Sequence, residues 1–283
     1  MTSMKSITVL SAAAVLAGVS GLAQANININ WTDQATSGFD AQETLLINTA
    51  IGRWEAVIVS FGAGAVSNDF NISITETQTA FIGFVDDVVE QASGTPASAI
   101  MEIDDGTFVN GFSSWFYDPT PNDSSEYTSS AFDHYGAAPQ NGSAGGAIDF
   151  LSVITHELGH ALGFAEAYSL WDAATNDATG VLTYGSETIG LQGTIFGGAL
   201  SHLDPDDAPF DLMLSAGTFP GPGGEPGGGG FGDRRLISAL DLDILAAVYG
   251  YEVDYSNLGV VPAPGVASLM LLGGILSVGR RRR

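Results

Sequence analysis

The chain has 283 residues and a mass of 29.2 kDa, a size for one large domain or two small ones. It carries 32 acidic residues against eight Lys and Arg, and the stretch 26–261 holds all of the acids but only three of the cations. This charge excludes nucleic-acid binding, and adsorption of the central region to an anionic membrane. The absence of cysteine excludes disulfides, cysteine nucleophiles and thiolate zinc sites, whereas 45% hydrophobic residues suffice for a folded core.

Residues 1–25 have the features of a secretory signal peptide. Lys5 precedes an apolar run over 7–22, which ends in the small-x-small triplet Ala23-Gln24-Ala25. The alternative is a buried N-terminal helix. The run is too short and too rich in small residues to be a stable membrane span. We therefore expect an exported mature chain that begins near Asn26.

The C-terminal segment 259–283 has a different three-part pattern. A Pro-containing break precedes a mostly apolar stretch over 265–278, and four arginines end the chain at Arg280–Arg283. This pattern resembles the bacterial PEP-CTERM sorting signal, with Pro262-Ala263-Pro264 in place of Pro-Glu-Pro; a plain transmembrane tail anchor is the alternative. The sorting signal implies contact with sorting machinery, and either interpretation implies contact with the membrane. It also places the protein at the cell surface, in the periplasm or in the extracellular matrix of a Gram-negative-type bacterium.

Between these ends, the first expected element is a helix over 40–57. Asp40 can cap it, and its apolar residues recur at helical spacing. The alternation of polar and apolar residues over 71–75 predicts a strand. Further strands are expected at 97–103 and 106–110, on either side of an Asp-Asp-Gly turn.

The second half of the central region contains two more expected helices. The irregular stretch 115–146 is expected to lie at the surface, and an amphipathic helix follows over 149–163, with Gly163 as its stop. Another irregular stretch continues to Leu200, and the Gly/Pro-rich residues 217–232 predict a loop. A last helix is expected from Ser238 to Gly250. We assign residues 26–258 to one domain.

The motif His156-Glu157-Leu158-Gly159-His160 lies within the expected helix 149–163. Residues four apart on a helix differ by roughly 40° of rotation and about 6 Å of rise, so both imidazoles leave the same face. Two imidazoles so placed can share one Zn²⁺. Glu157, on the adjacent face, can take a proton from a water activated by the metal and deliver it to a leaving amine.

A catalytic zinc site requires a third protein ligand. In the compact His-Glu-x-x-His-x-x-Gly-x-x-His pattern this ligand stands six residues after the second histidine, where the present chain has Glu166. The competing candidate is His202, which is followed eleven residues later by Met213. His134 is expected to be a loop residue.

The segment Asp149 to Phe164 resembles the active-site helix of the metzincin metallopeptidases, which include the matrixins. The later Ser201-His202 and Asp211-Leu212-Met213 resemble the delayed third histidine and the Met-turn of the leishmanolysin-like branch. The resemblance implies His156, His160 and His202 as zinc ligands, Glu157 as general base and Met213 beneath the metal. It also implies an α+β fold, with a twisted mixed sheet, an active-site helix and a C-terminal helical subdomain, and a cleft between the N- and C-terminal parts.

Other residues suggest weaker hypotheses. Oxygen ligands for a structural Ca²⁺ could come from an acidic run beside His202, or from an acidic pair in the irregular segment; solvated loops are the alternative. Tyr168 or Tyr251 could donate a hydrogen bond to the oxyanion of the reaction. The acidic residues in question are Asp204, Asp206, Asp207 and Asp211 in the run, and Asp118 and Asp123 in the pair.

Taken together, these patterns predict an exported zinc metalloendopeptidase that acts on proteins or peptides, with weak affinity for acidic peptides. One alternative is a surface or matrix structural protein with a non-catalytic metal site. The other is a zinc hydrolase of a non-peptide bond. An intact Glu157 argues against the first alternative, because a purely structural site does not need a base.

Overall fold

The computed structural model describes residues 26–34, 38–79, 82–107, 115–123, 126, 137–138, 147–192, 200–208, 211–214 and 234–258. The expected signal peptide, the C-terminal segment 259–283, the loop 217–232 and His134 lie outside these residues. Within the described ranges, no helix is both long enough and apolar enough to cross a membrane.

The fold is α+β and is built on a mixed four-stranded sheet with the order β1-β3-β5-β4. The first three strands run parallel and β4 pairs antiparallel with β5 at the edge. Alternate residues of β3 and β5 are buried, so one face of the sheet points into the core. The bounds are Asn28–Asp33 for β1, Asp69–Thr77 for β3, Gly83–Glu90 for β4 and Pro96–Asp104 for β5.

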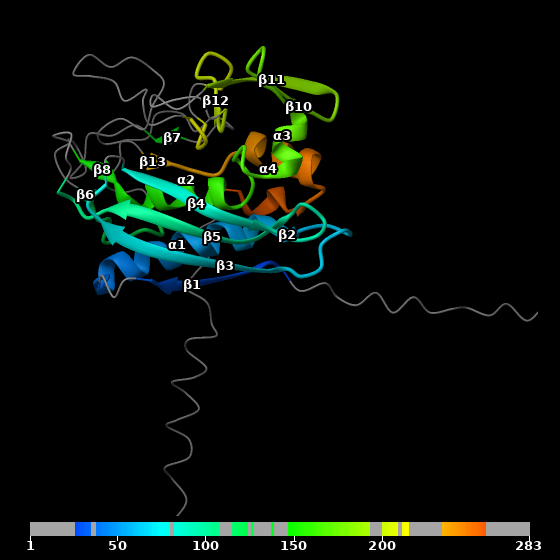
Figure 1. Ribbon diagram of the computed structural model, residues 1–283. Coiled ribbons are helices and arrows are strands. Elements are labelled where there is room, and N and C mark those ends of the chain that lie inside the picture. Colours follow the sequence, from blue (N-terminus) through cyan, green and yellow to red (C-terminus); the bar gives the residue numbers. More distant parts are fainter. Residues whose placement is uncertain are drawn as a thin grey trace, which may run out of the picture.

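Helix α1 (Ala41–Val57) begins where the sequence predicts. The Asp40 carboxylate accepts hydrogen bonds from the N–H groups of Gln42 and Glu43, and the Glu43 side chain accepts one from the Asp40 N–H. This capping box satisfies backbone donors that the first turn leaves free. The helix packs against α2 (Phe150–Ala161), and both lie along the sheet (Figure 1).

Helix α4 (Ala239–Tyr249) also has the expected ends. Ser238 and Asp241 form a capping box at its start, and Gly250 ends it in the left-handed conformation with φ +75°. The helix packs against α3 (Ser169–Ala174) and strand β10. Its buried face adds Leu242, Ile244 and Leu245 to the core.

A second four-stranded sheet, with the order β12-β11-β10-β9, lies near α3 and α4 (Figure 1). Three two-stranded pairs, β14-β2, β6-β8 and β13-β7, tie distant segments together. The bounds in the second sheet are Thr175–Asn176 (β9), Val181–Tyr184 (β10), Glu187–Gln192 (β11) and His202–Leu203 (β12). Those of the pairs are Ile58–Ser60 (β2), Trp115–Phe116 (β6), Ala137–Ala138 (β7), Ile148–Asp149 (β8), Arg234–Arg235 (β13) and Glu252–Val253 (β14), and the short helix η2 spans Tyr255–Asn257.

Several sequence expectations need correction. The strands expected at 71–75 and 97–103 are present but longer, whereas Gly106 and Thr107 are not in a strand and 108–110 lie outside the described residues. The stretch between Gly163 and Leu200, expected to be irregular, contains α3 and most of the second sheet. Helix α2 ends at Ala161, two residues before the expected stop.

Candidate metal centre

Three histidines from two distant segments meet beside α2. His156 and His160 are one turn apart on the helix, and β12 brings His202 to them. The Nε2 atom of His160 lies 3.0 Å from Nε2 of His156 and 3.1 Å from Nε2 of His202. Among the described residues, these three are the group of His, Cys, Asp or Glu side chains that converges closely enough to hold a metal ion, with ligand atoms within 4.8 Å of one another.

Backbone carbonyls orient two of the three rings. Nδ1 of His156 lies 2.6 Å from the Leu212 oxygen, and Nδ1 of His160 lies 2.5 Å from the Phe164 oxygen. A carbonyl oxygen only accepts, so each Nδ1 must carry the hydrogen. In a neutral ring, Nε2 then presents a bare lone pair.

The electrostatics of the site keep the rings neutral. Burial lowers the pKa of His156 to about 4, and the positive charge of Arg235 acts in the same direction. Burial, followed by the neighbouring His156, lowers the pKa of His160 to about 3. Burial and the other two histidines also hold the pKa of His202 well below its usual value. At neutral pH the site therefore offers uncharged nitrogen ligands.

This arrangement fits a divalent zinc ion. Two facing lone pairs on His156 and His160 at 3.0 Å repel each other unless a cation lies between them. Tetrahedral zinc with Zn–N bonds of about 2.0–2.1 Å separates its nitrogen ligands by about 3.3 Å, close to the distances observed. The residues present thus have the number, chemistry and spacing of a three-histidine zinc site.

Glu157 lies next to the histidines, in the contact between α2 and the edge strand β4. Glu157 is 6% exposed, and its buried Oε2 atom has no hydrogen-bond partner in the described part of the chain. A Cβ atom built on Gly83 would lie 3.1 Å from Oε1, so the glycine leaves the room that the carboxyl group occupies. Burial raises the pKa of Glu157 to about 8, and a neighbouring cation would lower it by favouring the charged form.

The turn that contains Met213 connects the ligands from both segments. Its Leu212 carbonyl faces His156, and its Met213 carbonyl accepts a 2.9 Å hydrogen bond from the N–H of Leu203, next to His202. The Asp211 carboxylate accepts from the Met213 N–H and from the Ser238 hydroxyl, which joins the turn to the start of α4. The turn therefore positions His156 and the strand that carries His202.

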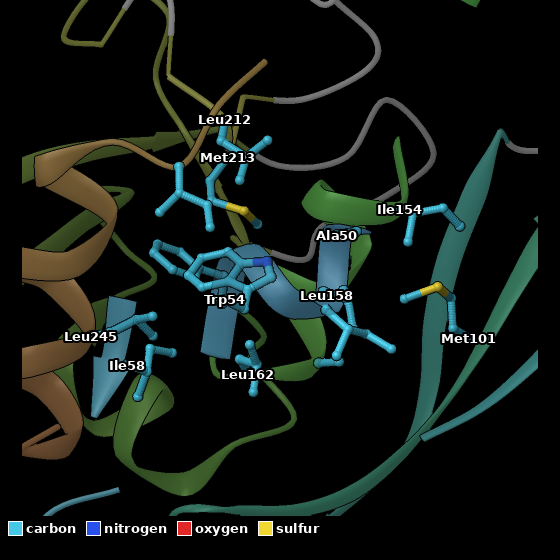
Figure 2. Packing of buried hydrophobic residues seen from close by; sticks show 14 of the residues in the cluster. Ala50, Trp54, Ile58, Met101, Ile154, Leu158, Leu162, Leu212, Met213 and Leu245 are labelled. Carbon is cyan, nitrogen blue, oxygen red and sulfur yellow. The ribbon is translucent and has the colours of Figure 1, made fainter. Parts of the chain in front are cut away.

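The Met213 side chain lies under α2 and is fully buried. A Cβ atom at Gly159 would lie 2.4 Å from its sulfur atom and 3.4 Å from the Trp54 indole, so close packing here depends on glycine. Trp54 is the centre of the labelled cluster in Figure 2 and donates through its indole N–H to the Thr155 oxygen. This packing holds the histidine helix against α1.

The tyrosine hydroxyl groups have a different role from the one predicted. The Tyr168 hydroxyl donates to the Ala161 oxygen at 2.5 Å, and the Tyr251 hydroxyl donates to the Leu162 oxygen at 2.8 Å. Tyr249 donates to the Gly163 oxygen at 2.5 Å. Both predicted oxyanion donors are thus buried and bound to carbonyl groups at the end of α2, so that prediction was wrong.

The start of α2 is held by a buried arginine. Arg234 forms ion pairs with Asp118 and, at 3.0 Å, with Asp149. Its guanidinium group also donates to the backbone carbonyl oxygen of Asp123 at 2.9 Å. Asp118, one of the residues considered for calcium, is therefore occupied by a cation of the chain itself.

The remaining candidate ligands do not join the histidines. The Glu166 carboxylate accepts a hydrogen bond from the Leu200 N–H, and Glu166 is not part of the converging group. In the acidic run, Asp204 accepts from the Asp206 N–H, and Asp207 accepts from the Gly190 N–H at 2.7 Å. Among the described residues no three carboxylates converge as the histidines do, which leaves the calcium hypothesis without support.

Sequence reasoning missed several residues that build the site. The carbonyl groups of Leu212 and Phe164 act through the backbone, so their residue types carry no signal. Gly83 and Arg234 gave no local pattern either, because each meets its partner only in the folded chain. The lone arginine pair in a strongly acidic region was the one available clue, since a buried cation needs acidic partners.

A scan against protein-family models found no match for this chain, and a search of curated proteins found none either. The geometry of the site is therefore the basis on which a function can be inferred. That geometry is a buried cluster of three histidines, two of them in a His-x-x-x-His arrangement on α2, with a carboxyl group beside it.

Proposed function

We propose that the protein is an exported zinc-dependent metalloendopeptidase of metzincin type. One observation carries this proposal: three imidazoles converge at their Nε2 atoms, and the neighbouring Glu157 has a buried Oε2 without a hydrogen-bond partner among the described residues. His156, His160 and His202 would hold the ion, and Glu157 would act as the base.

When bound, zinc would supply Lewis-acid chemistry that polarises the scissile carbonyl and makes water more acidic. Glu157 accepts a proton from the attacking water while the new C–O bond forms. It then transfers the proton to the amide nitrogen as the C–N bond breaks, so the products are a carboxylic acid and an amine, which ionise to a carboxylate and an ammonium group at neutral pH. The hydrogen bonds to Leu212 and Phe164 keep two of the rings in the orientation that this requires.

Several features support the metzincin assignment beyond the ligands. Met213 packs beneath the histidine helix, against Gly159, and its turn contacts the strand of the third histidine. The mixed sheet with an antiparallel edge strand beside α2 agrees with the proposed fold. The N- and C-terminal segments favour export, with the domain retained at or near the outer side of the inner membrane.

The test is proteolysis of casein or a peptide library by the purified protein. We expect cleavage that a chelator abolishes and zinc restores. Glu157→Gln should retain one equivalent of zinc but lower kcat/KM by about 10²–10⁴-fold, since it removes only the proton acceptor. The matched control is Glu252→Gln, an exposed carboxylate on β14, which should leave the rate unchanged.

Two outcomes would contradict the proposal. A wild-type protein that holds one equivalent of zinc and cleaves nothing would indicate the non-catalytic metal site. A protein that hydrolyses esters or other small substrates in a Glu157-dependent way, but no peptide, would indicate the non-peptide hydrolase.

A further inference from the structure

The third histidine lacks the support that the other two have. Nδ1 of His156 and Nδ1 of His160 face carbonyl oxygens at 2.6 and 2.5 Å. Among the residues that the structure describes, Nδ1 of His202 has only the Ser201 hydroxyl, at 3.4 Å, which is long for a hydrogen bond. When Nε2 of a neutral histidine binds a metal, Nδ1 carries the hydrogen and normally donates it to an acceptor.

An acceptor of suitable chemistry lies on the neighbouring strand. Gln192 of β11 is the direct cross-strand partner of His202. Side chains directly opposite each other in an antiparallel pair project from the same face, with Cβ atoms about 4.5–5.5 Å apart. The Gln192 Oε1 atom is buried and has no hydrogen-bond partner among the described residues, a costly state for an amide oxygen.

We propose that Gln192 is a positioning residue for the metal: its side-chain oxygen accepts the Nδ1 hydrogen of His202 in the zinc-bound protein. This hydrogen bond satisfies two groups at once, because the two side chains are direct cross-strand partners on the same face of the β11–β12 pair. It fixes the tautomer and the ring orientation of the one ligand that comes from outside α2. The inference rests on the zinc site of the proposed function but not on catalysis.

The experiment measures the zinc dissociation constant by competition with a chromophoric chelator. Gln192→Leu, which removes the acceptor at similar volume, should weaken zinc binding by about 10–100-fold. Gln192→Glu keeps an acceptor and should bind zinc with at least the wild-type affinity. The matched control is Thr175→Val on β9 of the same sheet, which removes another buried oxygen that lacks a partner and should leave zinc binding unchanged.

A spectroscopic measurement separates this role from a general effect on folding. In the zinc-bound wild type, the Nδ1 hydrogen of His202 should give an NMR signal protected from exchange, and Gln192→Glu should move that signal downfield. The proposal would be overturned if the signal does not move, or if Gln192→Leu binds zinc within about twofold of the wild-type affinity. It would also be overturned if Ser201→Ala, and not Gln192→Leu, loses zinc affinity. A wild type that binds no zinc overturns both proposals, whereas one that needs Gln192 for zinc but cleaves no peptide overturns only the proposed function.

Discussion

Gly159 shows how a single residue in the motif can decide the packing of a site. It stands between the two helical histidines, and a methyl group there would overlap the sulfur of Met213. The close approach lets the turn that contains Met213 reach α2, and with it the carbonyl that orients His156. Glycine in the middle of a helix normally costs stability, so close packing is a physical reason for its presence here.

Glu76 is a second residue with a strong environmental effect, and it lies outside the metal site. Burial, the largest cause, and the negative charges of Glu43, Asp105 and Asp40 together raise its pKa to about 7. The folded state thus favours the protonated carboxyl. Its stabilising effect is present below the ordinary value of 4.5 and is lost as the pH rises towards 7.

We therefore expect Glu76→Gln, which mimics the protonated form, to raise the urea midpoint at pH 8 and to change it little at pH 4.5. The measurement is urea unfolding followed by circular dichroism at both pH values. The control is Glu102→Gln, the same substitution on the neighbouring strand β5. An equal effect of Glu76→Gln at both pH values would show that the pKa of Glu76 is not raised in the fold.

At the scale of elements, the histidine helix is held at both ends by long-range contacts. Arg234 forms an ion pair with Asp149 at its start. At its end, three tyrosine hydroxyl groups donate hydrogen bonds to the last carbonyl oxygens. Gly163, with φ +146°, leaves room for the Tyr249 ring. A helix so anchored keeps its two imidazoles in place without relying on helix propensity.

Removal of one cap should be measurable. Tyr251→Phe leaves the Leu162 carbonyl buried without this donor and should lower the free energy of unfolding by about 1–3 kcal/mol. Tyr255→Phe is the control, because its hydroxyl donates to Asp243 at the surface and its loss should cost less than about 0.5 kcal/mol. Equal losses of unfolding free energy in the two variants would mean that the Tyr251 hydroxyl stabilises the protein no more than a surface hydroxyl does.

The elements also show what the sequence could predict. The starts of α1 and α4 follow from local capping residues, and the strands β3 and β5 follow from alternation. The strands β1, β4 and β9–β12 were missed, because short or acidic strands have weak patterns and depend on their partners. The pairing of β11 with β12, which places Gln192 opposite His202, has no signal in the sequence either.

At the scale of the whole molecule, the site combines the histidine helix α2 with two later segments, the strand β12 and the turn that contains Met213. The pair His156 and His160 was predictable from helical spacing alone. The approach of His202 depends on the β11–β12 pairing and on the Met213 turn. The sequence alone therefore left His202 and Glu166 as competing candidates for the third ligand. The structure brings His202 to the pair and directs Glu166 to Leu200.

The most direct test of this account is zinc K-edge X-ray absorption on the reconstituted protein. We predict one zinc per chain with three imidazole nitrogens at about 2.0–2.1 Å. The His202→Ala variant should show two. A wild-type spectrum with fewer than three imidazoles, or a protein that retains no zinc, would contradict the central claim.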